Sequence, residues 1–156
     1  MALAELKLRQ RSDYGFFLDC CTRWNDNDMY GHVNNSIYYF LFDSIVNTYL
    51  IQHCGLQPLT SAQIGLVVHS HCNYFSPVSF PATLKLGLRT NRLGTSSVEY
   101  EIGVFERGCP EVKAVGGFVH VFVAREAGRP VKQGMPLEMR EGLEKLLQRG
   151  SISSKL

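Results

Sequence analysis

Two hydrophobic patterns follow one another along the chain. Between Asn35 and His53, apolar residues occupy nearly every face of a helix, and a helix that is apolar all round is buried. Elsewhere the apolar positions have the spacing and residue types of strands. These strand-like segments are residues 15–23, 67–75, 84–88, 97–104 and 115–123. The order predicts an α+β fold in which one strand precedes a long buried helix and four antiparallel strands follow, so that a curved antiparallel sheet wraps around the helix.

Glycine and proline mark the ends of these elements. Gly55 suits the position just after the helix, and Gly94 and the segment 107–110 are expected to form turns between strands. A final amphipathic helix is expected at about Glu138 to Leu147. No repeat or linker divides the 156 residues, a length that suits one domain. We expect an N-terminal segment at 1–14, the main domain at 15–136, a C-terminal helix at 137–149 and a tail at 150–156.

Composition and charge exclude several classes of protein. With 45% hydrophobic and 19% charged residues, the chain has the composition of a soluble globular protein and not of a disordered one. A formal net charge of +2 gives no general electrostatic case for binding nucleic acid. The most apolar stretch, 37–51, contains Asp43 and Asn47, so no membrane span is expected. Five cysteines without a Cys-x-x-Cys pair favour reduced thiols and argue against a cysteine metal site.

The most informative segment lies between the first strand and the long helix. Residues 23–35 contain two carboxylates, Asp26 and Asp28, together with a glycine, a histidine and several asparagines. A carboxylate at the start of a helix lies beside unpaired backbone N–H groups and the positive end of the helix dipole. This arrangement suits chemistry on a carbonyl group.

The motif and the order of elements together resemble the hotdog-fold acyl-CoA thioesterases of the 4-hydroxybenzoyl-CoA thioesterase-like family. The resemblance covers about residues 16–136, nearly the whole predicted domain. One departure is Pro81-Ala82, where many relatives have a glycine followed by an acidic residue. The residues that carry the resemblance are Arg23, Trp24, Asp26, Asp28, the run Gly31-His32-Val33-Asn34-Asn35, Tyr38, the run Tyr74-Phe75-Ser76-Pro77 and the segments 122–126 and 128–131.

The resemblance implies a hotdog fold and the hydrolysis of an acyl-CoA to coenzyme A and a free carboxylic acid, without a cofactor. It places the catalytic carboxylate at Asp28, acting either as the nucleophile or as a general base on water. It also implies that the backbone N–H of about Asn35, at the start of the helix, polarises the thioester oxygen. Because this family builds its pockets between subunits, we expect a homodimer or a homotetramer.

Two other functions stay open on the sequence. One is a non-catalytic acyl-CoA-binding hotdog protein, with the same pocket and no turnover. The other is a hotdog enoyl-CoA hydratase, because other branches of the fold run that chemistry, usually with an Asp and His pair. Against the hydratase, Asp28 and His32 lie in one short loop, whereas a separately placed pair is expected there.

Further residues of the motif and the helix are candidates for the pocket. His32 is expected to hydrogen-bond within the turn or to line the pocket, Gly31 to allow a tight turn close to the substrate, and Tyr38 to contribute to the pocket. Asp43 lies within the apolar helix, and a buried carboxylate needs a partner. We therefore expect Asp43 to face a subunit interface or to border the active site, and Asp26 to order the loop.

Basic residues at strand ends and in loops are candidates for holding the phosphates of coenzyme A. The set comprises Arg89, Arg92, Arg125, Arg129 and Lys132. His69 and His71 lie on one face of a strand, but no third metal ligand has suitable spacing. The run that starts at Asp26 does not fit a calcium loop, because Tyr30 and Ile37 occupy its fifth and twelfth positions. No metal site is predicted.

The last three residues suggest a location. Ser154-Lys155-Leu156 has the form of a receptor-read peroxisomal address. We therefore expect the protein in the peroxisomal matrix, with the peroxisomal import receptor as a partner. The alternative is the cytoplasm, with the tripeptide as a chance ending in a bacterial protein. Peroxisomes shorten fatty acyl chains as CoA thioesters, so the location and the resemblance point to the same lipid metabolism.

Overall fold

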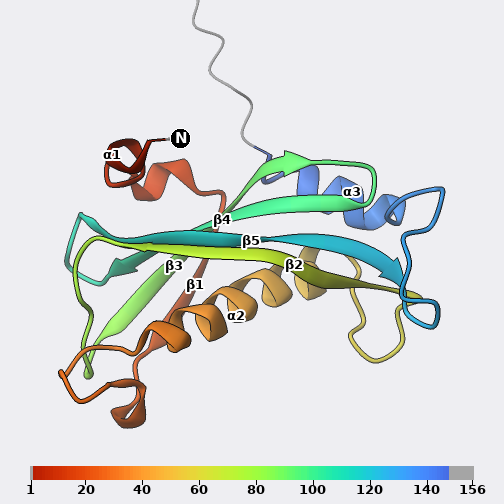
Figure 1. Ribbon diagram of the computed structural model, residues 1–156. Coiled ribbons are helices and arrows are strands. Elements are labelled where there is room, and N and C mark those ends of the chain that lie inside the picture. Colours follow the sequence, from red (N-terminus) through yellow and green to blue (C-terminus); the bar gives the residue numbers. More distant parts are fainter. Residues whose placement is uncertain (1, 148–156) are drawn as a thin grey trace, which may run out of the picture.

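A curved five-stranded antiparallel sheet lies against one long helix (Figure 1). This computed structural model describes residues 2–147, so the predicted tail at 150–156, the Ser154-Lys155-Leu156 signal and residues 148–149 lie outside the described residues. The strands have the order β1-β3-β4-β5-β2 across the sheet, which confirms the predicted α+β plan. They are β1 (Phe16–Cys21), β2 (Gln63–Tyr74), β3 (Thr83–Leu93), β4 (Ser97–Glu106) and β5 (Val112–Ala124).

The long helix α2 (Asn35–His53) has the bounds that the sequence predicts. It begins where the Asn34 side chain accepts a hydrogen bond of 3.0 Å from the backbone N–H of Ser36, the usual role of an N-cap asparagine. It ends just before Gly55, whose φ of 67° is a left-handed conformation that glycine adopts without strain. Local signals at both ends therefore fix the length of the helix.

One side of α2 packs against the sheet, and the prediction that the helix is buried on every side is wrong for this chain. Phe40 and Ile51 are 64% and 48% exposed on the other side. The physical reason is that the sheet of a single chain covers only one flank of the helix. Asp43 follows the buried Phe42 and so points about 100° away from it, which leaves its carboxylate exposed and not buried as expected. The buried residues are Tyr38, Phe42, Ile45, Val46, Tyr49 and Leu50.

Close contact between α2 and the sheet depends on a glycine of β5. A Cβ atom added at Gly116 would lie 2.7 Å from the ring of Phe42, so only glycine allows the phenyl ring to rest on the strand. At the far end of α2, the short helix α3 (Leu137–Glu144) packs through a hydrogen bond of 2.6 Å from the Tyr49 hydroxyl to the Gly142 carbonyl. Within residues 2–147, none of the helices has both the length and the apolar character that a membrane span needs.

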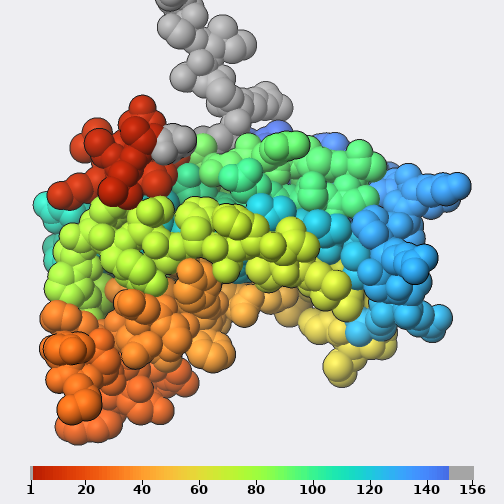
Figure 2. Space-filling model, in the orientation of Figure 1, coloured from red at the N-terminus to blue at the C-terminus, as the bar shows by residue number. Residues whose placement is uncertain are grey.

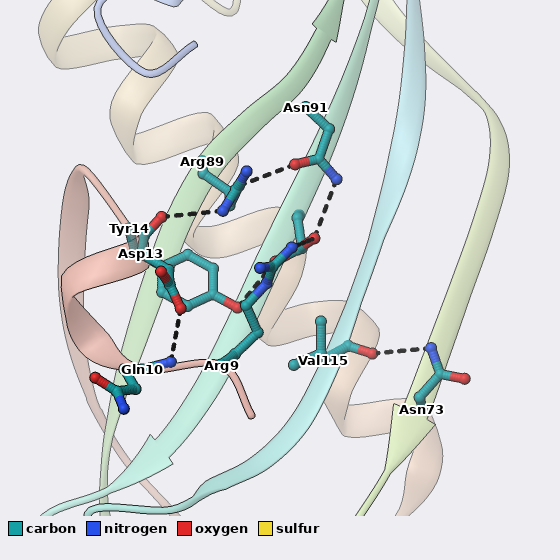
Figure 3. Close-up of polar contacts among 9 residues, drawn as sticks. Arg9, Gln10, Asp13, Tyr14, Asn73, Arg89, Asn91 and Val115 are labelled. Carbon is teal, nitrogen blue, oxygen red and sulfur yellow. Dashed lines mark hydrogen bonds and ion pairs between the residues drawn. The ribbon is translucent and has the colours of Figure 1, made fainter. Parts of the chain in front are cut away.

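The N-terminal segment lies on the opposite face of the sheet from α2 (Figure 1). It contains the short helix α1 (Leu3–Leu6) and the 3-10 turn η1 (Arg11–Asp13), and it is held by an ion pair between Arg9 and Glu101 of β4. Arg9 donates to both carboxylate oxygens, at 2.7 and 3.1 Å, and the hydroxyl of Tyr14 and the amide of Asn91 donate to the same carboxylate (Figure 3). Burial alone raises the pKa of Glu101, but the hydrogen bonds from Arg9 and Asn91 outweigh it, so the pKa lies below its usual value.

Three buried polar side chains on the helix-facing side of the sheet have an atom without a hydrogen-bond partner among the described residues. They are Thr90 of β3, Tyr100 of β4 and His120 of β5, and the rings of Tyr100 and His120 meet edge to face at 5.4 Å between centroids. Burial lowers the pKa of His120 to about 4, so its imidazole is neutral at physiological pH. A Cβ atom added at Gly65 of β2 would lie 2.7 Å from Nδ1 of His120, so this glycine makes the space that the ring occupies.

Candidate active site

The loop between β1 and α2 is pinned to the segment that leads into β3. The backbone N–H of Val33 donates to the carbonyl of Val78 at 2.7 Å. Three hydrogen bonds join Thr22 and Ala82: the N–H and the hydroxyl of Thr22 donate to the Ala82 carbonyl at 2.9 and 3.2 Å, and the Ala82 N–H donates to the Thr22 hydroxyl at 2.8 Å. Ala82 belongs to the Pro81-Ala82 pair that departs from the family pattern, and its backbone serves to hold the loop.

Asp26 orders this loop from within, as expected. Its carboxylate is buried and accepts hydrogen bonds from the backbone N–H of Arg23 at 2.7 Å and from the Arg23 guanidinium at 2.9 and 3.1 Å. Its carbonyl accepts from the N–H of Asn34 at 2.8 Å, which places the N-cap of α2. All of these contacts lie within the loop, so Asp26 is a structural residue.

Asp28 is the second carboxylate, and only half of it is engaged. Its Oδ1 atom accepts from the backbone N–H groups of Tyr30 at 2.8 Å and His32 at 3.3 Å. Its carbonyl accepts from Gly31, whose φ of 77° makes the predicted tight turn. Within residues 2–147, Oδ2 accepts no hydrogen bond. The turn therefore fixes the orientation of the carboxylate and leaves one oxygen available to a ligand.

A pocket of about 310 Å³ is lined in part by Asp28. Asn35, the first residue of α2, forms part of its wall, and its backbone N–H donates to no acceptor in the described part of the chain. The first N–H groups of a helix lack intrahelical partners and carry the positive end of the dipole. Asp28, with its free carboxylate oxygen, and Asn35, with its unpaired N–H, therefore line the same pocket.

Aromatic rings close the inner end of the pocket. Tyr38 is buried and meets Tyr74 edge to face, with 5.0 Å between ring centroids. Burial, with a smaller contribution from Cys72, raises the pKa of Tyr38 to about 12, so its hydroxyl stays protonated at neutral pH. Phe75 and Ser76 continue the wall, and their backbone N–H groups are anchored to the carbonyl of Lys113. The pocket is therefore part polar and part aromatic, as a site for an acyl thioester requires.

The structure brings together four of the residues that the sequence predicts for the site. Asp28, His32, Asn35 and Tyr38 all line the pocket. Gly31 lies at the exposed tip of the turn and shapes the loop from outside the pocket wall. The pocket residues that the prediction missed are Val33, Ser76 and Pro77, whereas Tyr74 and Phe75 were expected to set the depth of the pocket. The run Tyr74 to Pro77 is among the residues that carry the family resemblance, and that resemblance was the signal in the sequence that pointed to this part of the pocket wall.

Asp43 does not reach this pocket within one chain. It borders a separate hollow of about 670 Å³ between α2 and β1, whose wall includes Phe40, Leu41 and Cys20. Although the side chain is exposed, its partial desolvation raises the pKa of Asp43 above its usual value. Its role at a subunit interface stays a prediction.

None of the basic residues predicted as candidates for holding coenzyme A lines the pocket of this chain, and three of the arginines show why. Arg89 donates to Asn91 at 2.9 Å and to the carbonyl of Asp13 at 3.4 Å on the face opposite α2 (Figure 3). Arg92 lies nine residues beyond the start of β3, roughly 30 Å along the strand from the loop that holds Asp28. Arg129 follows β5 at the end of the sheet away from that loop (Figure 1). Any of these arginines that contacts a bound ligand would have to reach the pocket of another subunit.

Metal ligands are not grouped in this chain. Among residues 2–147, no three His, Cys, Asp or Glu side chains are placed to hold a metal ion. His69 and His71 do lie together on β2, with 5.7 Å between ring centroids, but as a pair.

Comparison with known proteins agrees with the fold and the motif. Over residues 30–113 the chain matches the family model of the thioesterase superfamily. The PA5185 protein of Pseudomonas aeruginosa strain PAO1 is 51% identical, with a TM-score of 0.86 over 90% of this chain and 96% of its own. A thioesterase of Thermus thermophilus, solved in complex with coenzyme A and zinc, is 25% identical, with a TM-score of 0.70 over 83% of this chain and 98% of its own.

A curated relative adds no function. The uncharacterized protein YsmA of Bacillus subtilis (strain 168) is 25% identical over 122 residues, which are 78% of this chain and 81% of that protein. The family model covers more than half of the chain, including the turn after Asp28, the start of α2 and the pocket wall at Tyr74. The chain therefore belongs to the thioesterase superfamily, in its 4-hydroxybenzoyl-CoA thioesterase-like group, and has the hotdog fold.

Proposed function

We propose that this protein hydrolyses an acyl-CoA to a free carboxylic acid and coenzyme A, with Asp28 as the catalytic carboxylate. The observation that carries the proposal is the pairing of the free Oδ2 of Asp28 with the unpaired N–H of Asn35 across one pocket. Membership of the thioesterase superfamily supports thioester hydrolysis in general. The coenzyme A bound to the Thermus relative supports an acyl-CoA as the substrate.

The pocket suits the two charges that thioester hydrolysis creates. The carbonyl oxygen of the thioester would accept a hydrogen bond from the Asn35 N–H, and the dipole of α2 stabilises the negative charge that develops on that oxygen. The carbonyl carbon then lies on the side of Asp28. His32 borders the pocket, and its N–H helps to orient the carboxylate.

Asp28 has two routes to the same products. As a nucleophile, its Oδ2 bonds to the carbonyl carbon, the C–S bond breaks, coenzyme A leaves as a thiolate that takes a proton, and water then hydrolyses the mixed anhydride. As a general base, it takes a proton from a water molecule that attacks the carbonyl directly. In a single turnover in ¹⁸O-labelled water, a first molecule of acid without ¹⁸O would show the nucleophilic route with water attacking the carboxyl carbon of Asp28. One ¹⁸O atom in that acid is expected from the general-base route and also from attack of water on the acyl carbon of the anhydride.

A second copy of the chain would complete the pocket. β2 is an edge strand, and its residues 66–71 are all exposed, including Leu66, Val67 and Val68. Figure 2 shows this yellow-green strand across the front of the molecule with no other segment over it. Long apolar edge strands invite pairing with another chain. A homodimer paired through β2, or a homotetramer of two such dimers, would place a partner beside Tyr74 and the pocket.

The test is a chromatographic assay of products from short, medium, long and aromatic acyl-CoAs and from an enoyl-CoA. Release of free coenzyme A supports the proposal, and the panel identifies the acyl group. Hydroxyacyl-CoA formed from the enoyl-CoA without free coenzyme A would show a hydratase instead. Binding without any product would show a non-catalytic acyl-CoA-binding protein. Chromatography is preferable to a thiol reagent, because the chain carries five cysteines of its own.

The peroxisomal location stays a prediction that rests on Ser154-Lys155-Leu156 alone. It can be tested by expressing the chain with a fluorescent protein at its N-terminus and comparing it with a version that lacks these residues. Peroxisomal import of the first and cytoplasmic fluorescence of the second would support the address. Cytoplasmic fluorescence of both would contradict it.

A further inference from the structure

Two exposed histidines mark the middle of the unpaired edge of β2. His69 and His71 pair with Val119 and Gly117 of β5, and both lie on the face of the sheet opposite α2. Their rings are 5.7 Å apart between centroids and nearly parallel, with 29° between the planes. Exposed imidazoles held this close on neighbouring positions of one face are arranged like two ligands of a metal ion.

The spacing agrees with the geometry of coordinated zinc. With Zn–N bonds of about 2.0–2.1 Å and tetrahedral angles, the centroids of two coordinated imidazole rings lie roughly 5 Å apart. Small rotations of the two exposed side chains would close the difference from 5.7 Å. A closed tetrahedral site needs four ligands, and in one chain this pair has no third ligand among residues 2–147.

The missing ligands would come from a second copy, an inference that rests on the dimer of the proposed function. A two-fold axis perpendicular to the sheet pairs β2 with its own copy in antiparallel fashion and keeps the same faces together. An axis near Ser70 falls within the exposed stretch 66–71, which is the part of the edge free to pair. With an axis near Ser70, His69 of each copy lies opposite His71 of the other, at cross-strand distances of about 5 Å, with diagonal neighbours at about 7–8 Å.

Two carboxylates lie near the pair. His71 borders a hollow that also contains Glu99 and Glu101 of β4. Arg9 pairs with Glu101, and Glu99 lies opposite Arg92 of β3 in the sheet, so the proposal depends on the imidazoles and not on a negative surface. Imidazole is a ligand that zinc and the neighbouring divalent transition metals prefer.

We propose that His69 and His71 of two copies form one four-histidine site for a divalent transition metal, of which Zn²⁺ is the type, on the two-fold axis of the dimer. The site is structural, because four protein ligands leave no open position for a substrate. It stabilises the pairing of the two β2 strands and takes no part in hydrolysis at Asp28.

The experiment titrates the chelator-treated full-length protein with ZnCl₂ by calorimetry and follows the dimer by analytical ultracentrifugation. We expect one Zn²⁺ for every two chains and a dimer dissociation constant at least about 10-fold lower with Zn²⁺ than without. His69→Ala and His71→Ala should each abolish both effects. His53→Ala removes an exposed imidazole from α2 and should abolish neither.

Spectroscopy with Co²⁺ in place of Zn²⁺ separates this site from binding to a thiol such as the exposed Cys21. A tetrahedral d–d spectrum without thiolate charge-transfer bands is expected. The proposal is overturned by the absence of Zn²⁺ binding, by one Zn²⁺ per chain, by binding that survives both histidine variants, or by a chain that stays monomeric with Zn²⁺. Release of coenzyme A is measured on the same samples, so a failed metal site and a failed thioesterase are separate results.

Discussion

The unpaired N–H of Asn35 can be removed without disturbing the helix that carries it. Asn35 is the first residue of α2, and proline is favoured at this position because its fixed φ suits the helix and its missing N–H has no intrahelical partner. The residue before a proline must be extended, and Asn34 already has φ −60° and ψ 142°. Asn35→Pro therefore deletes one hydrogen-bond donor from the pocket and leaves the fold intact.

The expected loss follows from the role of that donor. Removing one donor that stabilises an oxyanion typically lowers kcat by a factor of about 100 to 1,000, or about 3–4 kcal/mol of transition-state stabilisation. The free energy of unfolding should change by less than about 1 kcal/mol, because the N–H donates to no acceptor in the described part of the chain. The loss should therefore appear in kcat and not in stability.

The assay compares steady-state release of coenzyme A by wild type, Asn35→Pro and Asn35→Ala, with urea unfolding of each. Asn35→Ala removes the side chain and keeps the N–H, so its kcat should stay within about 3-fold of wild type. A folded Asn35→Pro variant whose kcat is equally close to wild type would refute the assignment of the oxyanion donor. Equal losses in the two variants would instead assign the effect to the Asn35 side chain.

Two further predictions concern stability. His120 is 4% exposed and its pKa is lowered to about 4, so the unfolded chain binds the extra proton between about pH 6.5 and pH 4. The contribution of neutral His120 to the free energy of unfolding is therefore complete above pH 6.5. It falls by about 1.4 kcal/mol per pH unit as the pH drops, or by roughly 3 kcal/mol in all. The free energies of unfolding of wild type and His120→Gln, measured in urea, should diverge over this pH range. Parallel plots of free energy against pH would contradict the burial of His120. Arg9→Met leaves the carboxylate of Glu101, which is 4% exposed, without its cation. The free energy of unfolding should fall by roughly 3–5 kcal/mol, and adding Glu101→Gln should recover part of this loss. A loss below about 1 kcal/mol would show that the ion pair is not a buried one.

Local signals made much of the fold predictable. The N-cap at Asn34 and the glycine at Gly55 delimit α2, and both act within a few residues of the helix ends. The strands follow from their residue types and from turns such as the one at Gly108, where φ is 85°. The turn after Asp28 is likewise local, because the carboxylate binds N–H groups two and four residues ahead.

What the sequence did not reveal depends on residues distant along the chain. The exposure of Phe40 on α2 depends on how far one sheet reaches around a helix, which helical periodicity does not contain. The ion pair between Arg9 and Glu101 joins residues 92 positions apart. The separation of Arg89 from the pocket likewise follows from which face of β3 it occupies, and that is set by the register with β1 and β4.

The most direct test of the central claim is the rate of coenzyme A release by Asp28→Asn relative to Asp19→Asn. Both variants replace a carboxylate with an amide, but Asp19 is exposed on β1 and pairs with Arg107, outside the pocket. We expect Asp28→Asn to remain folded and to lose on the order of 100-fold to 10,000-fold in kcat, while Asp19→Asn keeps the activity of wild type. A folded Asp28→Asn variant that retains full activity would contradict the account.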